Sequence, residues 1–580
     1  MAEDKFETHE IDFRQWLPWT LLFRGFWLAL DHKKLILAAG GILAMAVGWW
    51  ILAVVFINIP RTKMPVWPSD FPSSDYQGNN ETERELAAWN AFKVQRNSWN
   101  LRYEAAGPGP GTVVGGDDGY TDAGDVANSL EEFKKINDTI DPARRTYQLD
   151  GKEFTFAIKP HGQLRTWPWF EDRGPNPALL IAGKAGATDE AGASHLVPWQ
   201  RGGFFDWLVR VQIPVLIEPL VKFFRPVGYL LHPSAGALNK SYFLLVIAWT
   251  LGVWAIVGGA ITRIAAVQLS RDERVGIVEA IRFTLARWRS YFFASFAPLL
   301  GVAAVAIALS LFGIGNLIPG FAEVWDGLLW FLALGLALLM AFVLVGLIGW
   351  PMIHATLSTE GSDSFDALSR SYSYVYQKPW HYLWYAVVSL TYGAIVVFFV
   401  GLMGSLMVYF AKWGVGLTPG TNYFNRDPSY LFVFAPTSFG WRDLLLQGSP
   451  VVDPGGPGFH GWNYIGATLV AFWLYLVFLM VIGFGYSYFW SASTIIYLLM
   501  RRKVDDTDLD EVYLDEEDSE EAYSPSLTPA PASATTGSGQ LQMVEAPALR
   551  SSGSSPTSAS KESGGAAGDG GSGTDSGSSS

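Results

Sequence analysis

Residues 463–500 have the sequence NYIGATLVAFWLYLVFLMVIGFGYSYFWSASTIIYLLM, which contains no Asp, Glu, Lys, Arg or His over 38 positions. About 20 apolar residues in a helix cross the ~30 Å hydrocarbon core of a bilayer, and a helix satisfies its own backbone hydrogen bonds there. The run therefore predicts a transmembrane helix over 463–490. Because the whole run is longer than a bilayer needs, we expect this helix to be tilted or to continue into the cytoplasm.

Five further apolar runs also contain no Asp, Glu, Lys, Arg or His. They lie at 35–57, 242–262, 291–314, 328–350 and 382–410. The composition, with 50% hydrophobic residues and 25 Trp, fits a membrane protein that also has a sizeable aqueous part. We predict an α-helical polytopic membrane protein with six transmembrane helices: one at 35–57, and a five-helix bundle within 241–500.

The basic residues orient these predicted spans. Lys33 and Lys34 precede the first span, and Arg501, Arg502 and Lys503 follow the last. The connection after the second span holds six arginines, which are Arg263, Arg271, Arg274, Arg282, Arg287 and Arg289. Since Lys and Arg collect on the cytoplasmic side of a membrane, both termini are predicted to be cytoplasmic. The expected location is the cytoplasmic (inner) membrane, with several passes.

The segment between the first two spans is long enough for a separate domain. We predict an extracytoplasmic α+β domain over 58–203, with a hairpin signal in 146–158, where alternating apolar residues flank Asp150 and Gly151. Residues 204–240 are apolar but are broken by Pro214, Pro219 and Pro226 and carry several charges, which a spanning helix tolerates poorly. They favour an interfacial amphipathic helix on the outer leaflet. The alternative is a seventh span, which would invert the topology of everything after it.

The two ends of the chain are predicted to lie in the cytoplasm. Residues 1–34 are predicted to form an N-terminus with an interfacial helix, because 13–30 combine Trp, Phe and Leu with Arg14 and Arg24. The alternative for this stretch is a hydrophobic lead-in to the first span. Residues 501–580 form a tail that is first acidic and then rich in Ser and Gly, and its latter part cannot bury a core, so we expect disorder. A small apolar cluster that includes Val512 and Tyr513 is expected to dock on a partner or on the chain's own cytoplasmic face, or to remain solvated.

Two segments of the bundle resemble each other. After the second span, Leu269-Ser270-Arg271-Asp272-Glu273 precedes Glu279-Ala280; after the fourth, Leu357-Ser358-Thr359-Glu360 precedes Asp366-Ala367 at the same spacing. The pattern indicates a repeated unit of span, surface helix and return span. Over about 240–410 it resembles the membrane domains fused to some bacterial glycerophosphodiester phosphodiesterases, without their catalytic domain. The whole chain, with the sequence SASTIIYLLMRRKVDDTDLDEVYL at 491–514, also resembles large uncharacterised membrane proteins of planctomycete-type bacteria. Neither resemblance implies an enzymatic activity.

Several kinds of chemistry have no motif in this sequence. The chain has no Cys, its eight His show no metal-ligand spacing, and it lacks a nucleophile elbow and a phosphate-binding loop. We therefore predict no cofactor and no metal. The formal net charge of −13 arises mostly from the acidic stretch 505–521 and gives no argument for nucleic-acid binding.

Three functions are compatible with this sequence. We expect a non-catalytic scaffold or accessory subunit of an envelope complex, which binds a protein partner through the acidic tail or the extracytoplasmic domain. The alternative is a transporter or lipid-handling permease, which a cavity between the spans would favour. The third is an enzyme with an interfacial site, for which Glu171, Asp172 and His161 would have to meet. The six arginines are candidate contacts for anionic lipid headgroups, or they only set the topology.

Overall fold

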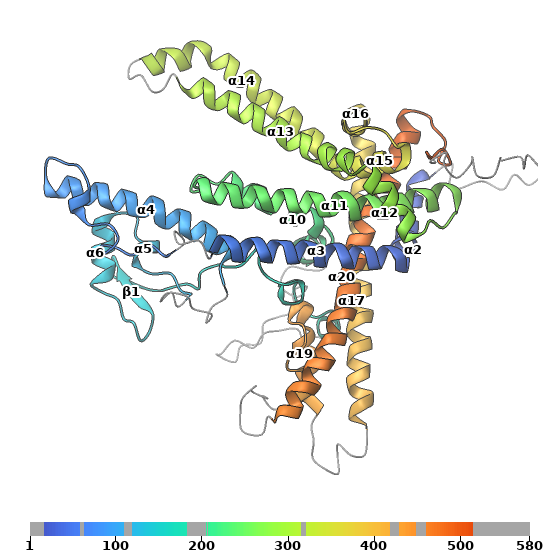
Figure 1. Cartoon of the computed structure of the whole chain (residues 1–580), viewed down its shortest axis with the longest axis horizontal. Helices are drawn as coiled ribbons and strands as arrows, with labels where there is room; N and C mark the ends of the chain where they lie inside the picture. Colours follow the sequence, from blue (N-terminus) through green and yellow to red (C-terminus); the bar gives the residue numbers. More distant parts are fainter. Residues whose placement is uncertain are drawn as a thin grey trace, which may run out of the picture. The chain divides into compact units, whose positions relative to one another are not determined.

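The computed structural model describes residues 17–57, 63–108, 119–182, 205, 207–314, 321–417, 428–447 and 460–513 (Figure 1). The predictions for residues 1–16, for 183–204 and for the Ser/Gly-rich tail lie outside the described residues. The described chain is mostly helical and contains six helices long and apolar enough to cross a membrane. The six predicted spanning helices are thus confirmed as helices, whereas their orientation stays a prediction.

The spanning helices extend beyond most of the predicted apolar cores. They are α3 (His32–Ile57), α11 (Ala237–Arg271), α13 (Trp288–Phe312), α14 (Phe321–Leu347), α17 (Pro379–Gly416) and α20 (Gly461–Val504). The span predicted at 328–350 ends earlier, because the chain turns at Ile348 and Gly349 and begins a new helix, α15 (Trp350–Glu360). Lys34, which the charge pattern places on the cytoplasmic flank, lies in the first turn of α3.

Burial separates the spans into two kinds. Every residue from Ile482 to Met500 of α20 is buried, and this part of the helix packs against α3, α11, α15 and α2. By contrast, the most apolar stretch of α14 has no buried residue, and most of its leucines are exposed, from Leu328 to Leu344. Such a continuous apolar surface is unstable in water and fits contact with lipid.

Small residues bring the central helices close together. Gly258 of α11 faces the ring of Trp490 on α20, and Gly259 faces Tyr291 on α13. A hydrogen bond from the Trp49 indole to the Thr250 hydroxyl, at 2.8 Å, joins α3 to α11. Close approach through small side chains, with a few interhelical hydrogen bonds, is the usual way that helices associate in a bilayer.

The sequence repeat has a structural counterpart, because the chain after α11 and the chain after α15 form similar helix ends and similar short helices. The residue that follows each helix, Asp272 after α11 (φ 55°) and Gly361 after α15 (φ 62°), adopts the left-handed conformation that terminates helices. The helices that follow, α12 (Ile277–Ala286) and α16 (Ser364–Gln377), are capped at their first turns and bury Ala280 and Ala367. The repeated acid therefore marks a helix start, and the repeated Ala marks its packed face.

The remaining described elements lie before α11 and in the last connection. The segment before α3 contains η1 (Pro18–Arg24) and α2 (Gly25–Ala29). The elements between α3 and α11 are η3 (Ser73–Asp75), α4 (Glu81–Ala106), α5 (Ala123–Val126), α6 (Leu130–Asn137), β1 (Thr146–Leu149), β2 (Lys152–Thr155), η4 (Pro168–Phe170), α7 (Pro177–Ile181), η5 (Leu208–Gln212), α9 (Ile213–Leu216) and α10 (Glu218–Leu230). Between α17 and α20 lie η7 (Pro428–Phe432), η8 (Ser438–Gly440) and α19 (Trp441–Leu446).

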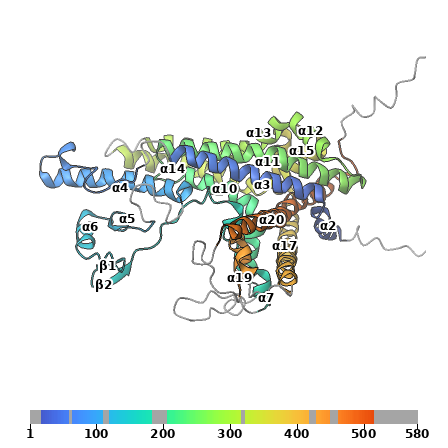
Figure 2. The ribbon, with the colours of Figure 1, turned by 60° about the horizontal axis from the view of Figure 1, so that its bottom comes forward.

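The module between α3 and the segment η5–α9–α10 is built around an aromatic core. Strands β1 and β2 pair antiparallel, with Tyr147 opposite Phe154, and Asp150 and Gly151 form the turn with φ of 52° and 76° (Figure 2). Two consecutive positive φ values are those of a two-residue hairpin turn, so the predicted hairpin is confirmed. Trp89 and Phe92 of α4 pack with Phe156 in this core, and Arg96 of α4 bonds to Asp122 and Asp125.

The close packing of α11 gives a test with a matched control. A methyl group added at Gly259 would lie 2.8 Å from Thr284 Cγ2 and 2.9 Å from the Tyr291 ring, whereas Gly252, two turns earlier, has no described neighbour within 4 Å. We expect Gly259→Ala to lower the free energy of unfolding by about 1–3 kcal/mol through overpacking. Gly252→Ala should leave it unchanged or raise it by up to about 1 kcal/mol.

Thermal unfolding of the full chain in the same detergent measures both variants. Equal melting temperatures for the two variants would contradict the packing described for α11.

Candidate functional site

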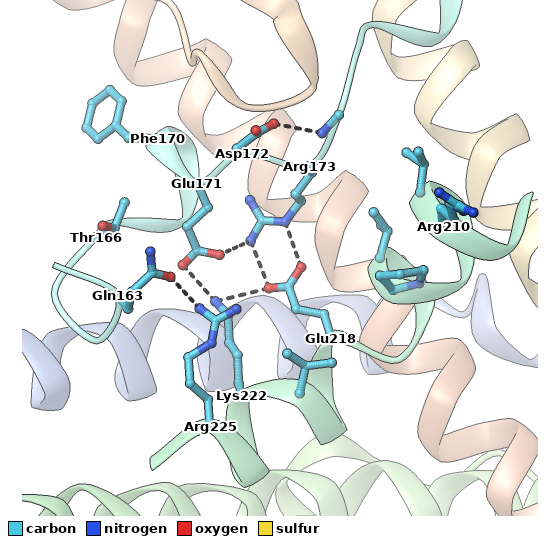
Figure 3. Close-up of a pocket in the computed structure, with 15 residues that line it drawn as sticks. Gln163, Thr166, Phe170, Glu171, Asp172, Arg173, Arg210, Glu218, Lys222 and Arg225 are labelled. Carbon is cyan, nitrogen blue, oxygen red and sulfur yellow. Dashed lines mark hydrogen bonds and ion pairs between the residues drawn. The ribbon is translucent and has the colours of Figure 1, made fainter. Parts of the chain in front are cut away.

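A cavity of about 510 Å³ lies between the loop 163–174 and the helical segment η5–α9–α10 (Figure 3). Both charged and apolar side chains line it. The charged ones are Glu171, Asp172, Arg173, Arg210, Glu218, Lys222 and Arg225, and the apolar ones include Phe170, Val211, Pro214, Val215 and Val221. Cavities of a few hundred Å³ with mixed lining are typical of small-molecule sites, so this is the candidate site of the described chain.

Four of these side chains form a closed ring of alternating charge. Arg173 bonds to Glu218 and Glu171, each at 2.7 Å. Lys222 completes the ring, with its Nζ 2.8 Å from Glu171 and 3.0 Å from Glu218. The side chains of Arg173 and Lys222 are only 3% and 7% exposed, so each cation depends on these carboxylates for its neutralisation. We call these four residues the ion-pair ring.

The ring also sets the ionisation of its most buried acid. Burial by itself raises the pKa of the Glu218 carboxyl, but the charges of Arg173 and Lys222 and their hydrogen bonds outweigh burial and hold that pKa well below its usual range. Glu218 is therefore a carboxylate at neutral pH, and it accepts hydrogen bonds rather than donating a proton.

Local geometry explains how the two halves of the ring meet. The chain bends at Ile217, between α9 and α10, which places Glu218 and Lys222 one helical turn apart on the same face of α10. On the opposite side, Asp172 Oδ1 accepts a hydrogen bond from the Gly174 amide at 2.9 Å, and Gly174 has a φ of 86°. This turn directs Arg173 toward α10, and it requires glycine because the backbone is left-handed there.

The ion-pair ring is attached to other parts of the bundle. The Tyr486 hydroxyl of α20 donates to Glu218 at 3.1 Å, and Arg173 donates to the Ser438 hydroxyl at 2.9 Å. Along α20, Tyr486 lies 15 residues before Arg501, which is about 22 Å of helix. The ion-pair ring therefore contacts the side of a candidate span well before its basic C-terminal end.

The predicted acid and histidine cluster forms only in part. Glu171 and Asp172 line the cavity, but His161 is not among its lining residues; the His161 Nδ1 lies 3.1 Å from the Lys159 carbonyl oxygen instead. Among the described residues, no three His, Asp or Glu side chains are arranged to hold a metal ion. From the sequence, Glu218 and Lys222 indicate only that 204–240 is poorly suited to span a membrane. Their four-residue spacing, which places both side chains on one face of a helix, is the sequence signal that they form an ion pair.

The six arginines after α11 have different environments. Arg263 is buried, and its guanidinium donates to the carbonyl oxygens of Ser358 and Tyr513, each at 2.8 Å, while it stacks on Phe283. Arg287 stacks on Phe283 and Tyr513. Arg271 is exposed and lines a second cavity near Glu360. The other three, Arg274, Arg282 and Arg289, are exposed, and contact with lipid headgroups stays a prediction for them.

The described start of the acidic tail docks on the chain itself. The Tyr513 amide donates to the Thr359 carbonyl oxygen at 2.7 Å, and Val512 is buried. Arg501 donates to the Glu511 carbonyl oxygen at 2.6 Å. Of the three alternatives for this apolar cluster, docking on the protein's own surface is the one that the structure shows for Val512 and Tyr513.

Comparison with known protein families, curated proteins and solved structures found no match. The resemblances drawn from the sequence pattern therefore stay predictions, and any function proposed for the chain rests on its sequence and geometry alone.

Replacing Glu218 tests the ion-pair ring. Glu218→Gln leaves Arg173 and Lys222 with one shared carboxylate, and removing one partner of a buried ion pair costs about 3–5 kcal/mol. We expect a corresponding fall in the thermal stability of the full chain in detergent. The control is Glu153→Gln, which removes an exposed charge on β2 and should change little.

The pH dependence has a defined sign. The pKa of Glu218 in the folded chain lies below its unfolded value of about 4.3, so its stabilisation is complete above that pH and is lost as the pH falls toward the folded pKa. The stability difference between the wild type and Glu218→Gln should therefore be constant between about pH 7 and 5 and narrow in stronger acid. A difference that widens on acidification would contradict the assignment.

Proposed function

We propose that the chain is a non-catalytic integral membrane protein that holds an extramembrane α+β module at the bilayer, as a scaffold or accessory subunit of an envelope complex. The observation that carries the proposal is the close packing of α20 against its neighbours. Two cavities that contact the spans, one beside Trp490 and one beside Tyr486, have volumes of about 10 Å³. Each has room for about one water molecule, which is too little for a permeation path.

The fixed attachment of the module supports the same function. The ion-pair ring joins the end of the module to α10. Two hydrogen bonds join it to α20, from the Tyr486 hydroxyl to Glu218 at 3.1 Å and from the Trp169 indole to the Tyr475 carbonyl oxygen at 3.0 Å. A buried pair of charges is costly to separate, so this attachment is rigid. Rigid display of one domain beside the membrane suits a protein that positions partners.

The proposed orientation places both termini in the cytoplasm of a bacterial cell and the module outside its inner membrane. Protein partners would bind the module or the acidic tail, and the exposed Arg274, Arg282 and Arg289 would contact anionic lipids of the cytoplasmic leaflet.

The second candidate function is lipid handling. The 510 Å³ cavity favours it, because both charges and apolar side chains line it beside a candidate span.

The absence of Cys from the sequence allows a clean test of orientation. Glu153 on β2 and Asp510 after α20 are both exposed, so each can be replaced by a single Cys. A membrane-impermeant maleimide added to spheroplasts should label Glu153→Cys, and should label Asp510→Cys only after the cells are opened. Labelling of Asp510→Cys in intact spheroplasts, with Glu153→Cys protected, would overturn the orientation.

Crosslinking in the native membrane tests the scaffold itself. Cells that produce the tagged full chain are crosslinked, the chain is purified, and the crosslinked positions are mapped by mass spectrometry. We expect a partner in near-equal amount, with crosslinks within 63–182 or beyond residue 504. The matched control is a chain that ends at residue 513, which should lose only crosslinks to the tail. A chain that stays solitary under these conditions would rule the scaffold out.

A further inference from the structure

We propose that the surface formed by α11, α15 and the end of α12 is a binding site for an extended peptide, and that the chain's own residues 511–513 are its exchangeable ligand. We call this surface, which is formed by Arg263, Arg287, Thr359 and Gly361, the peptide dock. The scaffold function does not require such a site. A second protein that offers a similar segment, with Val followed by Tyr, would compete with the tail for the dock.

The end of α15 explains why the ligand is a peptide main chain. The last four carbonyl groups of a helix have no partner within the helix itself. In α15, the carbonyl oxygen of Ser358 accepts a hydrogen bond from Arg263 at 2.8 Å, and that of Thr359 accepts one from the Tyr513 amide at 2.7 Å. Thr359 is only 1% exposed, so an occupant of the dock has to offer an N–H group to this carbonyl.

The dock also binds the carbonyl group of the same ligand residue. The Arg263 Nη1 donates to the Tyr513 carbonyl oxygen at 2.8 Å. Both main-chain groups of residue 513 are thus bonded to the dock, in the way that an added strand is bound through its backbone. These bonds do not depend on the side chain of the ligand, so they give affinity for an extended peptide of any sequence.

Two side chains give the dock its sequence preference. Val512 is buried in the hydrophobic core of the bundle. The Tyr513 ring lies against Gly361, where an added methyl group would be 2.6 Å from the ring. On Arg287, the guanidinium carbon is 5.2 Å from the ring centroid, and Nη2 donates to the Tyr513 hydroxyl at 3.4 Å. The dock therefore fits a branched apolar residue followed by an aromatic residue with a hydroxyl group.

The tail is held at few points, which allows it to exchange. Residues 505–513 fold back from the end of α20, where Arg501 donates to the Glu511 carbonyl oxygen at 2.6 Å. Within this segment only Val512 is buried. A cavity of about 520 Å³ lies beside the segment and is lined in part by Val512 and Tyr513 themselves. A competing peptide can enter from this side, and local release of the tail leaves the helices of the bundle in place.

Peptide binding to full-length chains tests the dock. In a released variant, Val512→Asp and Tyr513→Ala together remove both anchoring side chains. The probe is a fluorescent peptide with the sequence of residues 505–518, and its binding to the purified chain in detergent is followed by anisotropy. We expect it to bind the released variant, and to bind the wild type at least about tenfold more weakly because the tethered tail competes at a high local concentration. A folded released variant that does not bind the peptide would overturn the proposal.

Matched controls locate the site. A peptide that carries Val512→Asp should bind the released variant at least about tenfold more weakly, because a charge cannot replace a buried Val. Within the released variant, Arg287→Gln removes the contact with the ligand's tyrosine ring and should weaken binding by about threefold to tenfold. Arg282→Gln removes an exposed arginine of α12 and should not change it. Equal affinities of the two peptides, or of the two arginine variants, would reject the dock.

Hydrogen exchange in the unmodified chain gives an answer even if the released variant does not fold. The Tyr513 amide should exchange more slowly than in the free peptide, since it is bonded to Thr359, and an excess of the peptide should speed its exchange. Exchange as fast as in the free peptide would show that the tail is not bound, and protection that the peptide leaves unchanged would show that it does not exchange. Crosslinking to partners reports on the scaffold function independently.

Discussion

A polar group placed in apolar surroundings must find its partner inside the protein, and this constraint shapes every part of the described chain. The spanning runs meet it by forming helices, whose backbone groups bond to one another. Where charges approach α20, they close into the ion-pair ring, so that neither Arg173 nor Lys222 is left uncompensated. Where Arg263 is buried near the other end of the bundle, two carbonyl oxygens and an aromatic face surround its guanidinium.

The features that could be predicted are those that a local pattern encodes. Uncharged runs of about twenty or more residues predict spanning helices because the thickness of the bilayer fixes the length required. Asp150 and Gly151 predict the hairpin because few residue pairs adopt two positive φ values. The repeated acid and Ala predict two equivalent surface helices because the acid, Glu279 or Asp366, lies in the first helical turn and the Ala packs inward. The sequence predicts the ends of the helices less accurately. Hydropathy falls at Thr262 and Arg263, but α11 continues to Arg271.

The candidate site could not be assembled from the sequence. Its ring joins Arg173 to Glu218, which are 45 residues apart, and it rests on Tyr486, another 268 residues away. No spacing rule links such distant positions, because tertiary packing brings them together. The charges of 204–240 predict a helix at the membrane surface, and that location stays a prediction. What the sequence does not reveal is that Glu171 and Arg173 neutralise Glu218 and Lys222. Likewise, Arg263 was grouped with its five neighbours by charge alone, and only burial separates it from them.

The enclosed part of α20 has a consequence for how the protein is made. Residues 482–500 contact their surroundings on every side, yet they are synthesised after all the helices that enclose them. The earlier helices therefore cannot reach their final packing around this segment until α20 has been synthesised. A chain that stops before residue 482 would lack the surface against which α2, α3, α11 and α15 pack.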